Sequence, residues 1–170
     1  MKTLYSLLIL VIIYFINPFL AHAVTAGTPV VVTNVHDGDT VSIKIKSLFG
    51  IATTTEKVRL IGIDAPEFRD EPWGRRAKKH LKKLINESGG SVYLEYDLDR
   101  RDKYGRLLAY LWDKKGRMIN ERMIDDGYAV VFTVPPNVRY VKKFTEAQQR
   151  ARQNKSGIWG KDGYTKKFFQ

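Results

Sequence analysis

The sequence predicts a β-barrel with helices, an α+β fold in which five short strands combine with three α-helices. Three observations lead to this prediction. Segments rich in β-branched or alternating residues are separated by turn residues, other segments have helix signals, and the length of 170 residues suits one domain with its own core. Apolar residues make up 44% of the chain and aromatic residues 12%, which argues against intrinsic disorder.

Five segments have the composition of strands: 30–35, 41–46, 57–63, 92–96 and 107–112. Asp37-Gly38-Asp39 is a turn signal, so the first two strands should form a hairpin with acidic residues at its tip. Residues 47–55 are interpreted as a loop or second turn. The third strand should stop at Asp64-Ala65-Pro66, because proline cannot donate a hydrogen bond to a β-ladder.

The longest helix is predicted over residues 72–88. Its apolar residues recur at helical spacing and form one face, and Gly89-Gly90 should end it as a left-handed cap. The opposite face of this helix is basic and carries Arg75, Arg76, Lys78, Lys79, Lys82 and Lys83.

Two more helices are expected after the fifth strand. Asn120 can cap a short helix over 120–126 that Gly127 closes, and apolar residues at helical spacing predict a last helix that ends at about Asn154. Ile158-Trp159 should pack back on the core. This order of strands and helices fits the OB-fold, a five-stranded barrel that binds oligonucleotides.

The first 23 residues are expected to be a signal peptide. Lys2 precedes an apolar run from Leu4 to Phe19, and Ala21-His22-Ala23 supplies the small residues that signal peptidase requires. An uncleaved anchor is the alternative. We therefore expect an exported protein, secreted or periplasmic, with one domain over 24–160 and a basic tail over 161–170.

The charge of the chain points to a polyanionic partner. Lys and Arg number 29 against 18 Asp and Glu, for a net charge of +11. Nucleic acid, anionic lipid and acidic polysaccharide all suit this balance, and a solvated basic surface is the simpler alternative. The chain has no Cys, which excludes thiol catalysis and Cys-ligated zinc.

Acidic residues gather at the predicted strand ends. Asp37 and Asp39 lie in the first turn, Asp64 ends the third strand, and Glu67 follows it. Hard oxygen ligands without His or Cys suit calcium or magnesium. Each piece alone is also an ordinary turn or strand exit. The two histidines of the mature chain, at positions 36 and 80, are expected to have surface roles.

Two arginines complete a set that suits phosphodiester cleavage. Arg59 lies inside an apolar strand, where an outward, solvent-facing position is the alternative, and Arg106 lies where a loop enters a strand. The transition state of this reaction builds negative charge on phosphate oxygens, which the planar guanidinium group can bind in pairs. A cation held by carboxylates can stabilise the same oxygens, and a spare carboxylate can accept a proton from water.

The motifs also resemble the staphylococcal nuclease, or thermonuclease, family. Three segments match its pattern in order: VHDGDTV at 35–41, VRLIGIDAPE at 58–67 and DKYGRLLAYLW at 102–112. NERMIDDGYA at 120–129 and SGIW at 156–159 are similar as well. The resemblance runs from about Pro29 to Trp159, most of the mature chain.

The resemblance implies a five-stranded OB-fold barrel with three helices and a Ca²⁺ ion as cofactor. It implies that Asp39, Asp64 and the backbone carbonyl of Ala65 bind this ion. It assigns Arg59 and Arg106 to the scissile phosphate of DNA or RNA. Members often have Thr where Ala65 stands here, a change that a carbonyl ligand tolerates.

The resemblance further assigns Glu67 to the attacking water, and Lys103 and Tyr104 to a neighbouring phosphate. It implies cleavage at the 5′ oxygen, which leaves 3′-phosphate ends. Members have tyrosines near the break at Pro135-Pro136, where a base can stack, but Phe132 to Val134 stand there in this chain.

We therefore expect a monomeric, calcium-dependent endonuclease that hydrolyses DNA and RNA. It should need no obligate protein partner and should have no stable membrane association after signal cleavage. Two other interpretations are a non-catalytic nucleic-acid-binding barrel, which would tend to lack the acidic and arginine set, and a basic membrane-surface protein, which leaves Asp39, Asp64 and Arg106 unexplained.

Overall fold

A computed structural model describes residues 29–46 and 53–160 of the chain. The expected signal peptide, the basic tail and most of the predicted loop after the second strand lie outside these residues. Within the described ranges, none of the helices has the length and apolar content needed to cross a bilayer.

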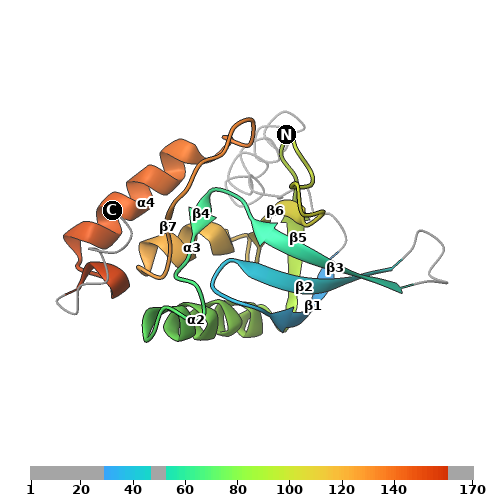
Figure 1. The fold of residues 1–170 in the computed structure, drawn as a ribbon, viewed down its shortest axis with the longest axis horizontal. Helices are drawn as coiled ribbons and strands as arrows, with labels where there is room; N and C mark the ends of the chain where they lie inside the picture. Colours follow the sequence, from blue (N-terminus) through green and yellow to red (C-terminus); the bar gives the residue numbers. More distant parts are fainter. Residues whose placement is uncertain (1–28, 47–52, 161–170) are drawn as a thin grey trace, which may run out of the picture.

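Five strands of the described residues close into a barrel (Figure 1). Around the barrel they follow the order β1 (Val30–Val35), β2 (Thr40–Lys46), β3 (Thr53–Leu60), β6 (Leu107–Trp112) and β5 (Ser91–Glu95). Neighbours are antiparallel except β3 and β6, which run parallel. The predicted hairpin of the first two strands and the predicted five-stranded barrel are confirmed.

Three α-helices accompany the barrel in the described residues, as predicted: α2 (Trp73–Glu87), α3 (Ile119–Asp125) and α4 (Val141–Gln153). A short 3-10 helix, η1 (Gly157–Trp159), follows α4. Two small strands outside the barrel, β4 (Ile63–Asp64) and β7 (Val130–Val131), pair with each other. In Figure 1 α2 lies along one side of the barrel, and α3 and α4 lie toward another.

The core fills the barrel and extends under the helices. Strand residues that alternate inward, such as Val41, Ile43 and Val58, are completely buried. From α2, Ala77, Leu81, Leu84 and Ile85 join the same cluster, which confirms the predicted apolar face. Gly89 and Gly90 follow α2 with positive φ angles of 71° and 75°, as a left-handed cap requires. Ile158 packs in a smaller cluster with Trp73 and Val130.

The third strand differs from its prediction at both ends. It begins at Thr53 instead of residue 57, because its β-branched threonines pair with the end of β2. It ends at Leu60 instead of Ile63, because Gly62 turns the chain with a φ of 78°. A Cβ atom at Gly62 would collide with the ring of Phe144, so only glycine fits this turn. Ile63 and Asp64 then form β4.

Asn120 does not cap a helix, contrary to its prediction. The N-cap position of α3 belongs to Met118, and Asn120 lies inside the helix with no exposed surface. Its side-chain oxygen accepts a hydrogen bond from Leu111 N, and its Nδ2 donates to Ile61 O, both at 2.9 Å. Asn120 therefore fastens α3 to β6 and to the turn that leads into β4.

Asn120→Ala should lower the free energy of unfolding by about 2–4 kcal/mol, because it leaves a buried N–H and a buried C=O without partners. Denaturant unfolding followed by circular dichroism measures this change. The matched control is Asn86→Ala at an exposed position of α2, which should alter stability by less than about 0.5 kcal/mol. A loss for Asn120→Ala no larger than that of the control would contradict this role.

His80 also differs from its prediction, because it is not a surface residue. Its side chain is only 12% exposed, and its Nε2 lies 2.7 Å from a carboxylate oxygen of Asp126. The imidazole stacks on the ring of Tyr128, with ring centroids 4.1 Å apart. The bond from His80 lowers the pKa of the Asp126 carboxyl. His80 therefore connects α2 to the end of α3.

Candidate functional site

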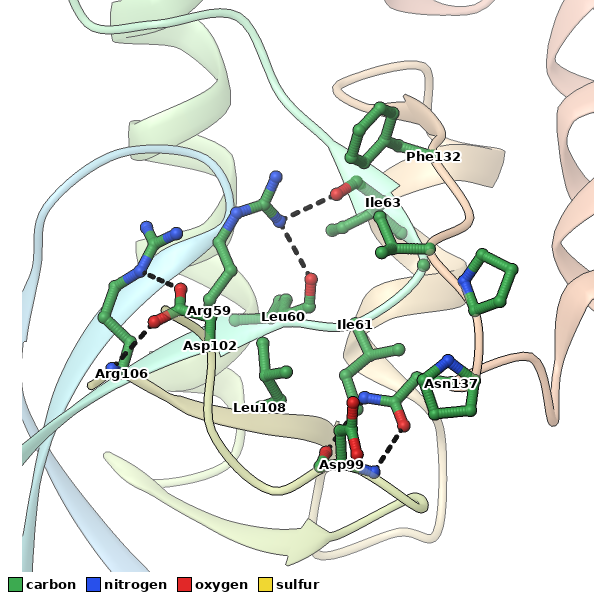
Figure 2. Close-up of a pocket in the computed structure, with 14 residues that line it drawn as sticks. Arg59, Leu60, Ile61, Ile63, Asp99, Asp102, Arg106, Leu108, Phe132 and Asn137 are labelled. Atoms are coloured by element: carbon green, nitrogen blue, oxygen red, sulfur yellow. Dashed lines mark hydrogen bonds and ion pairs between the residues drawn. The ribbon is translucent and has the colours of Figure 1, made fainter. Parts of the chain in front are cut away.

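Strand pairing places Arg59 and Arg106 on the same outer face of the barrel. In the parallel ladder of β3 and β6, Val58 pairs with Leu107 and Arg59 pairs with Leu108. Val58 and Leu107 are buried, so the residues that alternate with them point outward. Figure 2 shows the two arginine side chains extending in the same direction from their strands. A pair of residues 47 positions apart in the sequence thus meets through one parallel ladder.

The turn between β1 and β2 brings Asp39 to this face. The backbone N–H of Leu60 donates to Asp39 O at 2.8 Å, which fixes the turn against the end of β3. A Cβ atom at Gly38 would lie 2.5 Å from the methyl group of Ala65 and 2.7 Å from that of Ala77. Glycine at position 38 is therefore required for the acidic turn to approach β4 and α2 so closely.

Arg59 is held by contacts on three sides, and its side chain is only 15% exposed. Its Nε lies 3.1 Å from Asp39 Oδ1, and one terminal nitrogen lies 2.8 Å from Asp64 Oδ1. The other terminal nitrogen donates to the carbonyl oxygens of Leu60 and Ile63, at 2.9 and 2.7 Å. Arg59 thus points outward from the barrel, as the alternative expected, but it does not face solvent, because the turn at Gly62 brings Asp64 back beside it.

Asp39 is a buried carboxylate at the centre of the site. Besides Arg59, it accepts hydrogen bonds from the Thr40 hydroxyl at 3.0 Å and from Ala65 N at 2.9 Å. Burial raises the pKa of the Asp39 carboxyl to about 7, and although Arg59 lowers it, the nearby Asp37 and Asp64 raise it further. Burial likewise raises the pKa of Asp64. The site therefore holds a local excess of carboxylates that an additional cation would stabilise.

These residues line one hollow of about 460 Å³, here called the acidic hollow. Its lining comprises Asp37, Asp39, Thr40, Arg59, Asp64, Ala65, Glu67, Phe68, Arg69 and Arg106. The structure thus brings together the three residues expected to bind a metal, the two arginines expected to bind the phosphate, and Glu67, which was expected to act on the attacking water. Lys103 and Tyr104 are not part of this lining.

Arg106 is oriented by Asp102, which begins the matched segment 102–112 but was given no role from it. The Nε of Arg106 lies 2.7 Å from Asp102 Oδ2, and the backbone N–H of Arg106 donates to Oδ1 at 2.9 Å. Burial opposes ionisation of Asp102, but the bonds from Arg106 outweigh it and hold the pKa below its usual range. In the sequence, the i, i+4 spacing of Asp102 and Arg106 around Gly105 is the signal that could have indicated this pair. Because Asp102 contacts only Nε, the terminal nitrogens of Arg106 are left for a ligand.

Lys103 and Tyr104 lie beside Arg106 on the loop between β5 and β6. The ring of Tyr104 is exposed, and its centroid lies 5.1 Å from Lys103 Nζ and 5.5 Å from the guanidinium carbon of Arg106. An exposed ring between two cations is suited to contact with a polyanion next to the acidic hollow.

Glu67 lies at the open rim of the acidic hollow. Its side chain is 65% exposed and pairs with Arg69, with 2.6 Å between Glu67 Oε2 and the arginine nitrogen. An ion pair this exposed contributes little stability, so the carboxylate can exchange Arg69 for another partner.

An apolar groove of about 210 Å³ adjoins the acidic hollow and shares Arg59 and Arg106 with it (Figure 2). Its apolar lining comes from residues 60–63, from Leu108 and from the segment 132–137. Phe132 and Val134 are exposed, and Asn137 connects the segment to the β5–β6 loop through bonds with Asp99 N and Asp99 O. The apolar lining of the groove beside Arg59 and Arg106 suits a flat apolar group next to a bound anion.

A family model described as staphylococcal nuclease homologue matches residues 57–161, more than half of the chain. The chain belongs to the staphylococcal nuclease family. The match begins inside β3, extends through η1 and therefore includes Arg59, Asp64 and Arg106. The resemblance stated from the motifs is confirmed.

Three named proteins are similar in sequence to this staphylococcal nuclease homologue. Endonuclease YncB of Bacillus subtilis (strain 168) is 38% identical over 135 residues, which are 75% of this chain and 60% of that protein. The SPbeta prophage-derived endonuclease YokF of the same strain is 37% identical, over 75% of this chain and 43% of its own length. The chain thus spans about half the length of these two relatives. The thermonuclease of Staphylococcus intermedius is 36% identical over 78% of this chain and 77% of its own.

Proposed function

We propose that this protein is a calcium-dependent endonuclease that hydrolyses phosphodiester bonds of DNA and RNA and leaves 3′-phosphate ends. The observation that carries this proposal is the convergence of Arg59, Arg106 and the carboxylates of Asp39 and Asp64 on one hollow. Its relatives named endonuclease and thermonuclease support the same reaction class.

In this proposal the two arginines bind the scissile phosphate. Arg106 lines the hollow, and no residue that the structure describes forms a hydrogen bond or ion pair with its terminal nitrogens, whereas Arg59 is held at the wall by Asp39 and Asp64. Negative charge that develops on the phosphate oxygens is stabilised by these fixed cations without reorganisation of the site. The guanidinium plane can engage two oxygens at once, which a lysine cannot do.

Asp39, Asp64 and the carbonyl oxygen of Ala65 would hold the calcium ion. The donor set fits, because it consists of oxygens only and because the buried Asp39 lies near two further carboxylates with one arginine to balance them. In the described residues no three acidic or histidine side chains converge as a metal site, so two carboxylates, one carbonyl and solvent must suffice. When bound, the ion would supply positive charge at the phosphate and a place for water.

Glu67 would act on the attacking water. Its exposed carboxylate at the rim can accept a proton from a water molecule in the hollow once it leaves Arg69. Attack of this water on phosphorus would break the bond to the 5′ oxygen, which would take up a proton from solvent and leave as the hydroxyl of the next nucleoside, while the phosphate stays on the 3′ oxygen. A base would occupy the apolar groove, and Lys103 and Tyr104 would contact the neighbouring phosphate.

We further propose that the protein is exported by residues 1–23 and acts as a monomer outside the cytoplasm. The apolar run and the Ala21-His22-Ala23 site support export. Comparison of the molecular mass of the exported protein with that of the full chain would test cleavage of the signal.

The proposal predicts that purified protein degrades single-stranded DNA and RNA in calcium and not in a chelator. Gel analysis of both polymers, with calcium, with EGTA and with calcium restored, measures this. New ends should accept a 5′ label from polynucleotide kinase without phosphatase treatment, because they carry 5′-hydroxyl groups. Undiminished cleavage in EGTA would reject the calcium role, and binding without cleavage would favour a non-catalytic barrel.

A further inference from the structure

Part of the lining of the acidic hollow is not shared with the apolar groove. There Phe68 and Arg69 line the hollow, on the segment between β4 and α2. The ring of Phe68 is 52% exposed, and Lys78 Nζ lies 5.0 Å from its centroid. An exposed aromatic ring with a cation on its face thus borders the site on the side of α2.

Lys78 belongs to a basic stripe on α2. The stripe also contains Arg75, Lys79 and Lys82, and the helical spacing of these residues puts all four on one side of the helix. Lys78 and Lys82 are about one helical turn apart, roughly 5.4 Å along the axis. The contact of Lys78 with Phe68 places one residue of this stripe next to the lining of the acidic hollow.

The stripe has charge available for a ligand. Among residues 29–46 and 53–160, Lys79 and Lys82 have no ion-pair partner, and both are exposed. Arg75 pairs with Glu71, but that pair is solvent-exposed and contributes little.

We propose that Phe68, Lys78, Lys79 and Lys82 form an extended polynucleotide subsite. A strand whose scissile phosphate lies between Arg59 and Arg106 would continue past Phe68, stack a base on its ring and lay its following phosphates along α2. This inference rests on the proposed nuclease function and adds to it a second binding surface, which would contact the part of the strand that extends beyond the nucleotide in the apolar groove. Stacking on one exposed ring and phosphate contact to lysines are both independent of base sequence.

A nucleic-acid strand suits this surface better than an anionic membrane. A helix that lies in a membrane interface inserts its own apolar face between the lipids. The apolar face of α2 is buried against the barrel, since Ala77, Leu81 and Leu84 have no exposed surface. What remains outside is a row of cations that begins beside the exposed ring of Phe68, a residue that lines the acidic hollow.

The test compares a long and a short substrate. The substrates are a 30-nucleotide single strand and a dinucleotide whose one internal diester fills the acidic hollow. The triple variant Lys78→Gln/Lys79→Gln/Lys82→Gln should reduce the ratio of kcat/KM for the long strand to that for the dinucleotide by roughly tenfold. Its salt dependence on the long strand should become shallower by about 2 in log–log slope, because about 0.7 is lost per phosphate contact. Phe68→Ala should reduce the same ratio by roughly fivefold or more.

The matched control is Lys114→Gln/Lys115→Gln/Lys142→Gln. It removes the same charge at exposed positions outside the acidic hollow and the apolar groove, and it should leave the ratio unchanged. Equal ratios for the α2 variant, the control and the unaltered protein would overturn the subsite. A loss of binding to phosphatidylserine vesicles alone, with binding to the long strand intact in the α2 variant, would overturn it as well. If the unaltered protein cleaved neither the 30-nucleotide strand nor the dinucleotide, the proposed nuclease function itself would be rejected instead.

Discussion

Arg106→Ala should lower kcat on single-stranded DNA by about 10²–10³-fold while the protein keeps its fold. The variant removes a guanidinium group that lines the acidic hollow and that, in the proposed function, stabilises the charge developing on the phosphate. Asp102 retains its bonds from the backbone of Tyr104 and Arg106, so the loop between β5 and β6 keeps its shape. Steady-state kinetics at saturating substrate measure the effect, and thermal unfolding checks the fold.

Arg100→Ala is the matched control for Arg106→Ala. Arg100 is an exposed arginine of the same loop, and it lines neither the acidic hollow nor the apolar groove. Its kcat should stay within about threefold of the original, as is usual for surface changes. If Arg106→Ala turned over substrate as fast as this control, Arg106 would have no place in the chemistry.

Arg59→Lys should lower kcat by at least about 100-fold although the charge is conserved. A single ammonium group cannot bridge Asp39 and Asp64 and also bind the carbonyl oxygens of Leu60 and Ile63. Each buried acceptor left without its donor costs about 1–3 kcal/mol, so stability should fall as well. Kinetics combined with denaturant unfolding separate the two effects.

The two arginine variants should therefore differ in stability and agree in activity. Arg59 is enclosed by protein groups on three sides, whereas Arg106 is anchored through Nε alone. Arg101→Lys is the control for the conserved charge, because Arg101 binds Glu56 in a bidentate pair at the surface. A rate for Arg59→Lys close to that of Arg101→Lys would show that only charge, and not the planar fork, matters at position 59.

Much of the fold follows from local sequence signals. Alternation in β2 and the apolar face of α2 depend on residues close together in the chain, and each predicted its element correctly. The errors arose where a distant residue decides the outcome. The ring of Phe144 makes Gly62 a turn, and the backbone of Ile61 and Leu111 draws Asn120 into the interior.

The candidate site was predictable as a set of residues and not as an arrangement. Asp39, Asp64 and Arg106 stand in ordered motifs at strand ends. These motifs indicated one site that binds both a metal cation and a phosphate anion. Asp102 could not be assigned from the motifs, because its role appears only in its contact with the Arg106 side chain. Phe68 could not be assigned either, since its exposure beside the hollow depends on how the segment between β4 and α2 folds.

By itself, the sequence determined the element types, the family and the residue chemistry of the site, because periodicity and motif spacing are properties of neighbouring residues. Only the tertiary structure decided that Arg59 lies between two carboxylates, that the parallel pairing of β3 and β6 puts Arg106 on the same face, and that Lys78 meets Phe68. These facts depend on strand register and on a close approach at Gly38, which arise when segments far apart in the chain pack together.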